Sequence, residues 1–228
     1  MKRIWATVAV LSISTGLGVP ALVSAQPVEP QMISQGNAAD FLNRGFQRYR
    51  QGDVRGAIED FNQALRLDPN YVPAYQARGN LLSSQGNQQG AIADFNQALR
   101  LNNTFVPAYI GRASAHSAVG NQEAAIDDYT KALRLNNNYV QAYIGRAVAY
   151  AALRDYNRAL NDLNQALGRD SNNAAAYYNR GSVLALQGDR TNAMGDFQRA
   201  AELFRQQQNQ ALYQRAVNRM RLLQLQTN

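Results

Sequence analysis

The residues of this chain that could carry out chemistry are one histidine and a set of carboxylates, and the chain contains no cysteine. A general base or a metal site needs partners at defined geometry, and His116 has no second histidine to work with. The sequence shows neither a phosphate-cradling glycine loop nor a serine-centred motif. It therefore predicts no enzyme activity, no cofactor and no metal site. For His116 it predicts packing or a single hydrogen bond.

The other charged residues that stand out form two series with a period of 34 residues. The arginine series is Arg44, Arg78, Arg112, Arg146 and Arg180, and the aspartate series is Asp60, Asp94, Asp128, Asp162 and Asp196. Both fall at the margin of a predicted buried face, where an unpaired charge is costly and a bidentate pair is acceptable. We expect a ladder of internal salt bridges, each aspartate pairing with the arginine of the next repeat, since Arg215 then serves Asp196.

The elements that must position these charges are repeated helical hairpins. Small residues recur at the same period of 34, in the series Gly45, Gly79, Ala113, Ala147, Gly181, then Ala57, Ala91, Ala125, Ala159, Ala193, and Ala64, Ala98, Ala132, Ala166, Ala200. Counted from residue 38, they fall at positions 8, 20 and 27 of each repeat. A helix advances about 100° per residue, so positions 4, 8 and 11 share one face, and positions 20, 24 and 27 share a face of the next helix.

These residues resemble the tetratricopeptide repeat (TPR), whose pattern also has aromatic residues at positions 4 and 24. Position 4 is Phe41, Tyr75, Tyr109, Tyr143 and Tyr177, and position 24 is Phe61, Phe95, Tyr129, Leu163 and Phe197. The resemblance implies an all-α, right-handed α-solenoid of five hairpins, at 38–71, 72–105, 106–139, 140–173 and 174–207. We expect truncation of a position-4 ring to alanine to cost about 3–5 kcal/mol.

Glycine followed by aspartate or asparagine predicts the turn inside most hairpins, because glycine ends one helix and the polar residue caps the next. Repeat four instead has Arg154 and Asp155, where we expect some backbone strain. Residues 208–228 are predicted to form a capping helix and tail, whose leucines cover the last hairpin.

A concave groove is the expected binding surface, because in the TPR family positions 2, 5, 9 and 12 of the first helices line it. The candidates are Leu42, Phe46, Tyr49, Gln76, Asn80, Ser83, Ile110, Ser114, Ile144, Val148, Tyr178 and Ser182. Some of the isoleucines and valines could instead pack between adjacent first helices. The set holds no cation, so the carboxylate clamp used by some TPR domains is not expected.

The end of the chain is basic, and its candidate patch is Arg199, Arg205, Arg215, Arg219 and Arg221. This patch supports an alternative role, a tether to acidic proteins or an anionic membrane surface. Nucleic acid is not expected as a partner, because the basic residues are not interleaved with exposed aromatic residues.

The first 25 residues read as a secretory signal peptide, with Lys2 and Arg3, an apolar stretch, and Val23-Ser24-Ala25 as the cleavage region. Retention as an uncleaved anchor is the alternative. Residues 26–37 are predicted to be a flexible linker. The sequence thus predicts an exported, periplasmic or secreted scaffold that binds protein or peptide partners in its groove and assembles an envelope complex.

Overall fold

The computed structural model describes residues 36–225, and the predicted signal peptide and most of the predicted linker lie outside this range. Eleven helices make up the described part. In chain order they are α1 (Ala38–Arg50), α2 (Val54–Leu67), α3 (Val72–Ser84), α4 (Gln88–Leu101), α5 (Val106–Ala118), α6 (Gln122–Leu135), α7 (Val140–Ala152), α8 (Tyr156–Arg169), α9 (Ala174–Gln187), α10 (Arg190–Gln206) and α11 (Gln210–Leu225).

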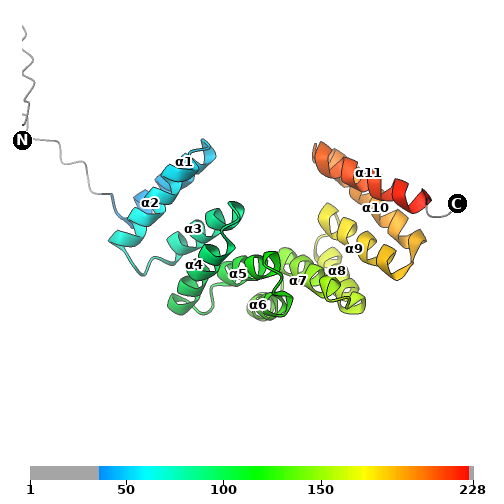
Figure 1. Cartoon of the computed structure of the whole chain (residues 1–228), viewed down its shortest axis with the longest axis horizontal. Helices are drawn as coiled ribbons and strands as arrows, with labels where there is room; N and C mark the ends of the chain where they lie inside the picture. Colours follow the sequence, from blue (N-terminus) through cyan, green and yellow to red (C-terminus); the bar gives the residue numbers. More distant parts are fainter. Residues whose placement is uncertain (1–35, 226–228) are drawn as a thin grey trace, which may run out of the picture. The chain divides into compact units, whose positions relative to one another are not determined.

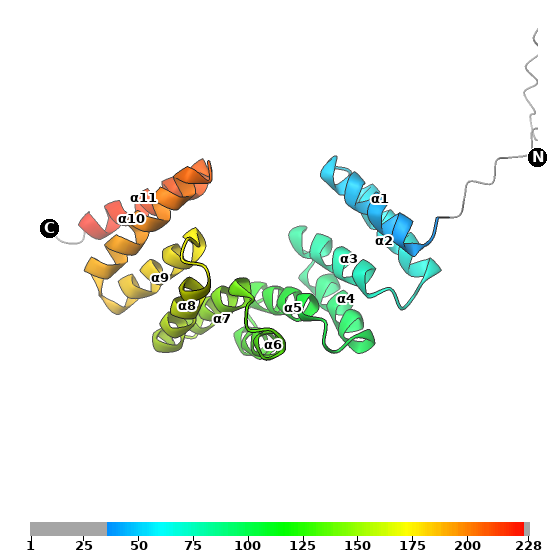
Figure 2. The same ribbon diagram turned by 180° about the vertical axis from the view of Figure 1, so that it is seen from behind.

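The first ten helices form five antiparallel hairpins, and each hairpin packs on the next (Figure 1). Each first helix also contacts the first helix of the following hairpin, so α1, α3, α5, α7 and α9 form one layer. The view from behind shows the same order of hairpins from α1 to α11 (Figure 2). The predicted all-α solenoid of five hairpins with a capping helix is confirmed.

The core is built from the small residues and from the side chains at position 24. The alanines at positions 20 and 27 are fully buried in every hairpin, and Phe61, Phe95, Leu163 and Phe197 are at most 1% exposed. The position-4 rings are only partly buried, apart from Tyr143. The expected cost of truncating a ring therefore applies to position 24, since those rings lose the most contact with neighbouring atoms.

Glycine lets the position-24 ring of one hairpin reach the first helix of the next. A methyl group added at Gly111 would lie 2.5 Å from Cζ of Phe95, and one added at Gly145 would overlap the Tyr129 ring. Close-packed interiors leave no room for such an addition. The rings of Phe95 and Tyr129 thus pack against the glycine at position 6 of the following repeat and hold repeats two, three and four together.

The arginine and aspartate series are paired within each repeat, which corrects the cross-repeat pairing expected from the sequence. Arg112 donates through Nε and Nη2 to the two Asp128 carboxylate oxygens at 2.7 and 2.6 Å. The other repeats have the same pairing, with Arg44–Asp60, Arg78–Asp94, Arg146–Asp162 and Arg180–Asp196. The two helices of a hairpin run antiparallel, so positions 7 and 23 lie opposite each other. Arg215 is exposed and does not serve Asp196.

Each arginine from the second repeat onward also reaches the preceding repeat. Arg112 Nη1 donates to Asn96 Oδ1 at 2.6 Å, and its guanidinium lies 5.6 Å from the centre of the Tyr109 ring. The equivalent acceptors for Arg78, Arg146 and Arg180 are Asn62, Thr130 and Asn164. The hydrogen bond to its aspartate raises the pKa of each of these arginines. These arginines therefore link successive repeats. The link runs through the residue at position 25 of the preceding repeat, and not through its aspartate.

The turns inside the hairpins follow the predicted glycine pattern with one exception. Gly52, Gly86, Gly120 and Gly188 have φ between 82° and 88°, whereas Arg154 stands in this left-handed region with φ 61°. Asp155 still caps α8, accepting the backbone N–H of Arg158 at 3.0 Å. The turn in repeat four is thus retained with a side chain at a position that favours glycine.

We expect Arg154→Gly to stabilise the protein by about 0.5–1 kcal/mol, because relief of the left-handed strain exceeds the added freedom of glycine in the unfolded chain. Urea denaturation followed by circular dichroism measures the change. Arg154→Ala is the matched control, since it removes the charge and keeps the Cβ atom. Equal gains in both variants would show that the arginine charge, not the backbone, is responsible.

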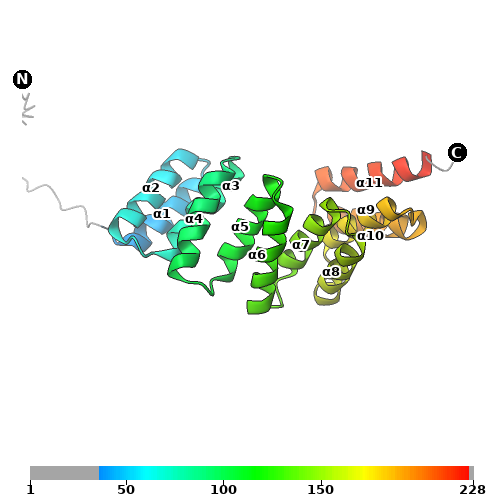
Figure 3. The same ribbon diagram turned by 60° about the horizontal axis from the view of Figure 1, so that its bottom comes forward.

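The capping helix α11 runs along α9 and α10 (Figure 3) and buries Ala216 and Leu223. Leu222 and Leu225 are 52% and 64% exposed. This corrects the expectation that the leucines of the tail all cover the solenoid. Leu222 and Leu223 are adjacent and lie about 100° apart around the helix, so they cannot share its buried face.

Candidate partner-binding surface

Several of the predicted groove residues line an aromatic recess between the first two hairpins. Phe46 and Tyr49 are 39% and 47% exposed, and with Phe61, Ala77, Asn80 and Leu81 they line a cavity of about 200 Å³. The Phe46 ring meets the Phe61 ring edge-on, with centroids 5.4 Å apart. Leu42 is buried in the core of the first hairpin and is not available to a ligand, which corrects its assignment to the groove.

In the middle of the predicted groove, the residues divide between exposed and packed ones. Val148 is 43% exposed, whereas Ile110 and Ile144 pack against the core, as foreseen in the alternative interpretation of these positions. Ser114 is exposed and bonds to the Tyr129 hydroxyl. Burial raises the pKa of Tyr129. This part of the surface is therefore apolar to neutral.

The three predicted groove residues of the second hairpin have different surroundings. The Ser83 hydroxyl donates to Oε1 of Gln88 at 2.9 Å, and Gln88 Nε2 in turn donates to the Ser83 carbonyl at 3.1 Å. Ser83 is thus engaged in holding its own hairpin closed. Gln76 is half-buried, and Asn80 is exposed.

On α9, in the last hairpin, the structure brings together residues from the predicted groove and from the predicted basic patch. Tyr178 and Ser182 come from the predicted groove, and Arg219 comes from the predicted basic patch. Arg219 Nε donates to the Tyr178 hydroxyl at 3.4 Å, and Ser182 and Arg219 line the same pocket. The Tyr178 ring also packs edge-on against Phe197, with centroids 5.5 Å apart. Two of the predicted groove residues therefore lie beside α11.

The predicted basic patch is only partly available. Arg199 forms a salt bridge with Glu202 at 2.9 Å and donates to Asn172 at 3.0 Å. Within residues 36–225, Arg205, Arg215, Arg219 and Arg221 form no salt bridge, and all four are exposed. Arg199 is thus part of the internal contacts of the last hairpin, and the other four arginines carry unneutralised charge.

His116 lies in the last turn of α5 and is half-buried. Its Nδ1 atom is buried and has no hydrogen-bond partner in the part of the chain that the structure describes. The described residues contain no group of three side chains that could hold a metal ion. Across the same residues, none of the helices combines the length and apolar character needed to cross a membrane.

Two residues beside the predicted groove were not predicted from the sequence, because they do not occupy positions 2, 5, 9 or 12 of a first helix. Tyr129 comes from the second-helix layer, yet its hydroxyl reaches Ser114 on α5 because Gly145 leaves space for its ring. Leu186, on α9, is 63% exposed beside Ser182. Glycine at position 6 of repeats three and four, where repeat two has Ala77, was the sequence signal for the position of this ring.

Solved structures similar to this chain share its fold. TTC0263, a thermophilic TPR protein of Thermus thermophilus, is 20% identical, with a TM-score of 0.67 over 79% of this chain and 98% of that one. YrrB, a TPR protein with an unusual peptide-binding site, is 21% identical, with a TM-score of 0.60 over 80% and 92%. The first TPR of Spaghetti (RPAP3), bound to the HSP90 peptide SRMEEVD, is 25% identical, with a TM-score of 0.51 over 52% and 94%. No curated protein matches the chain.

Family models agree with the hairpins described above. A model described as TPR repeat matches residues 45–86, and models described as tetratricopeptide repeat match 72–105, 106–139 and 145–211. Together they span most of the helical array, and they coincide with the repeats that carry the position-24 side chains and the arginine–aspartate pairs. The chain is therefore a tetratricopeptide-repeat protein.

Proposed function

We propose that this chain is an exported scaffold that binds a segment of a partner protein along its first-helix groove, in the assembly of an envelope complex. TPR proteins are generally scaffolds for protein interactions, which supports binding rather than catalysis. The observation that carries the proposal is the aromatic recess, where Phe46 and Tyr49 stay exposed in a cavity that a partner side chain could fill. Aromatic residues of this kind commonly anchor protein interfaces.

The chemistry of the groove selects its partner. YrrB has an unusual peptide-binding site, and the RPAP3 domain binds the acidic peptide SRMEEVD. Here, the first-helix positions near the recess offer Phe46, Tyr49 and Asn80, which are apolar or neutral. An apolar or neutral segment, held by packing and by hydrogen bonds to its backbone, is therefore the expected occupant of this part of the groove.

The groove is tested by a variant that changes only exposed residues, Phe46→Asp/Asn80→Asp/Val148→Asp. We expect partner capture from envelope fractions to fall at least tenfold, because burying three new carboxylates at an apolar or neutral part of the interface is costly. Leu135→Asp is a control for a charge on exposed apolar surface of the second-helix layer, and capture should persist in this variant. Unchanged capture by a folded triple variant would exclude the groove.

Export is the other component of the proposal, and it rests on the basic start, the apolar stretch and the Val23-Ser24-Ala25 region. Fractionation of the producing cells, followed by N-terminal sequencing, tests it. We expect a mature chain that begins near Gln26 in the periplasm or the medium. A cytoplasmic chain that retains Lys2 and Arg3 would contradict export.

A further inference from the structure

A second recess lies between the last hairpin and the capping helix, outside the aromatic recess already described. It is a pocket of about 280 Å³ in which α9 contributes Ser182, Ala185 and Leu186, α10 contributes Phe197, and α11 contributes Arg219, Leu222 and Leu223. This volume is slightly below the range of about 300–1,000 Å³ typical of small-molecule sites, and the lining is mainly apolar. It is large enough to receive an apolar side chain.

Large apolar side chains are exposed to solvent at the rim of this pocket. Leu186 and Leu222 are 63% and 52% exposed, and Leu225, one turn further along α11, is 64% exposed. Single exposed leucines are ordinary, but two that line one apolar recess, with a third nearby on α11, are typical of a surface that a partner covers. Phe197 and Leu223, which are almost fully buried, form the base of the pocket.

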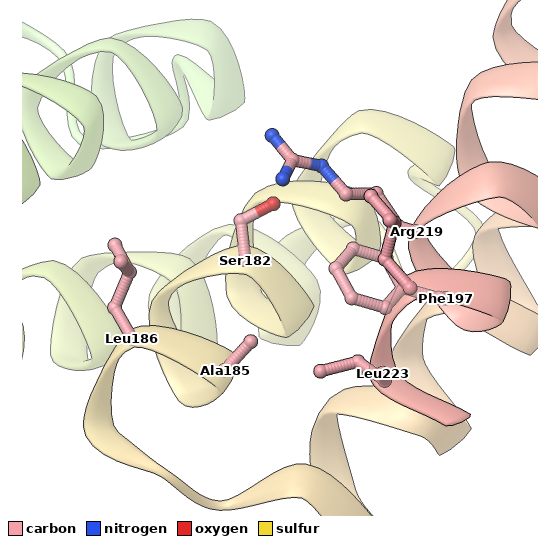
Figure 4. A pocket seen from close by; sticks show the side chains of 7 residues that line it. Ser182, Ala185, Leu186, Phe197, Arg219 and Leu223 are labelled. Carbon is pink, nitrogen blue, oxygen red and sulfur yellow. The ribbon is translucent and has the colours of Figure 1, made fainter. Parts of the chain in front are cut away.

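One cation stands at the mouth of the pocket. Figure 4 shows the Arg219 guanidinium extending over the recess towards the Ser182 hydroxyl, with Leu186 and Ala185 on one side and Leu223 on the other. Its Nε atom donates to the Tyr178 hydroxyl, and no carboxylate within residues 36–225 pairs with it. Helix α11 contains arginines and no acidic residue. The charge that complements this mouth is therefore negative.

We propose that this pocket binds an apolar side chain of a partner polypeptide that is followed by an aspartate or glutamate, whose carboxylate pairs with Arg219. The inference deepens the proposed function, because Tyr178 and Ser182 make the pocket one end of the same groove. The aromatic recess takes an apolar or neutral stretch of the partner, and this end takes an apolar residue with its acidic neighbour. The single cation distinguishes it from a multi-residue carboxylate clamp.

The probes that test this pocket are two short peptides, Ac-Gly-Leu-Glu-Gly-NH2 and its neutral counterpart Ac-Gly-Leu-Gln-Gly-NH2, titrated into isotope-labelled protein and followed by NMR. We expect the acidic peptide to shift the methyl signals of Ala185, Leu186 and Leu222. It should bind about fivefold more tightly than the neutral peptide, which is the upper range for an exposed ion pair. Raising the salt concentration should reduce this preference.

Arg219→Gln should abolish the preference for the acidic peptide. Arg215→Gln is the matched control, because it removes the same charge one turn earlier on α11 from a residue that does not line the pocket, and it should retain the preference. Equal affinity for both peptides, or an equal loss in the two variants, would overturn the proposal.

Two other occupants give distinguishable results, and either would overturn the proposal. If a second copy of the chain fills the pocket, the same methyl signals shift with protein concentration and without peptide. If an anionic bilayer covers it, phosphatidylserine vesicles broaden those signals while the peptides do not. Failure of the peptide test leaves the groove test intact, because Phe46, Asn80 and Val148 lie on α1, α3 and α7.

Discussion

Replacing Phe95 by alanine is expected to lower the free energy of unfolding by about 3–5 kcal/mol. Phe95 has no exposed surface, and its ring lies against Gly79 of its own hairpin and Gly111 of the next. Its removal therefore leaves a cavity that two hairpins share, and neither can close it without moving a helix. Urea denaturation followed by circular dichroism gives the value.

The control for this substitution is Tyr49→Ala, which truncates an aromatic side chain that is 47% exposed and should cost about 1 kcal/mol or less. Hydrogen exchange adds a positional readout, since stability in a repeat array is a sum of local units and their interfaces. Protection should fall first in α3 to α6. A loss in Phe95→Ala no larger than that in Tyr49→Ala would contradict the assignment of this ring to the core.

Replacing Asp162 by alanine is expected to cost about 3–4 kcal/mol, because it leaves a largely buried guanidinium without its carboxylate. The Asp162 side chain is 2% exposed, and its partner Arg146 is 17% exposed. Arg146 donates to both carboxylate oxygens at 2.8 Å. The same denaturation assay measures this loss.

Asn161→Ala, at the neighbouring exposed position, controls for general effects on α8 and should stay within about 0.5 kcal/mol of the parent. The double variant Arg146→Met/Asp162→Leu should recover at least half of the loss, because an apolar pair of similar volume avoids the unpaired charge. If Asp162→Ala were as stable as Asn161→Ala, the ladder would not contribute to stability.

The fold could be predicted from the sequence because the same pattern of buried residues and turn residues recurs five times, with a period of 34 residues. Each alanine at positions 20 and 27 is buried, and each glycine at the hairpin turns adopts positive φ, so the pattern and the physics agree in every repeat. The partner of each aspartate could not be predicted in the same way. In a strict repeat, Asp60 recurs with Arg44 and with Arg78 at equally constant spacing, and only the antiparallel hairpin decides between them.

The candidate surface was less predictable, because its residues vary from repeat to repeat. Position 5 lies at the margin between adjacent first helices, so Leu42 is buried there while Ile144 is half-buried. Helix α11 lies outside the repeats. Its sequence therefore cannot be aligned with other helices of the chain to show which of its leucines are buried. The exposure of Leu222 and Leu225, and with it the terminal pocket, emerged only from the packing of α11 on α9 and α10.

Photo-crosslinking in intact cells shows whether the first-helix groove receives a partner protein. p-Benzoylphenylalanine is placed at Phe46, in the recess, and separately at Leu135, which is equally exposed on the second-helix layer. We expect a discrete crosslinked product from position 46 and none from position 135. Crosslinks of equal yield at both positions, or a product from position 135 alone, would show that the partner does not bind in the groove.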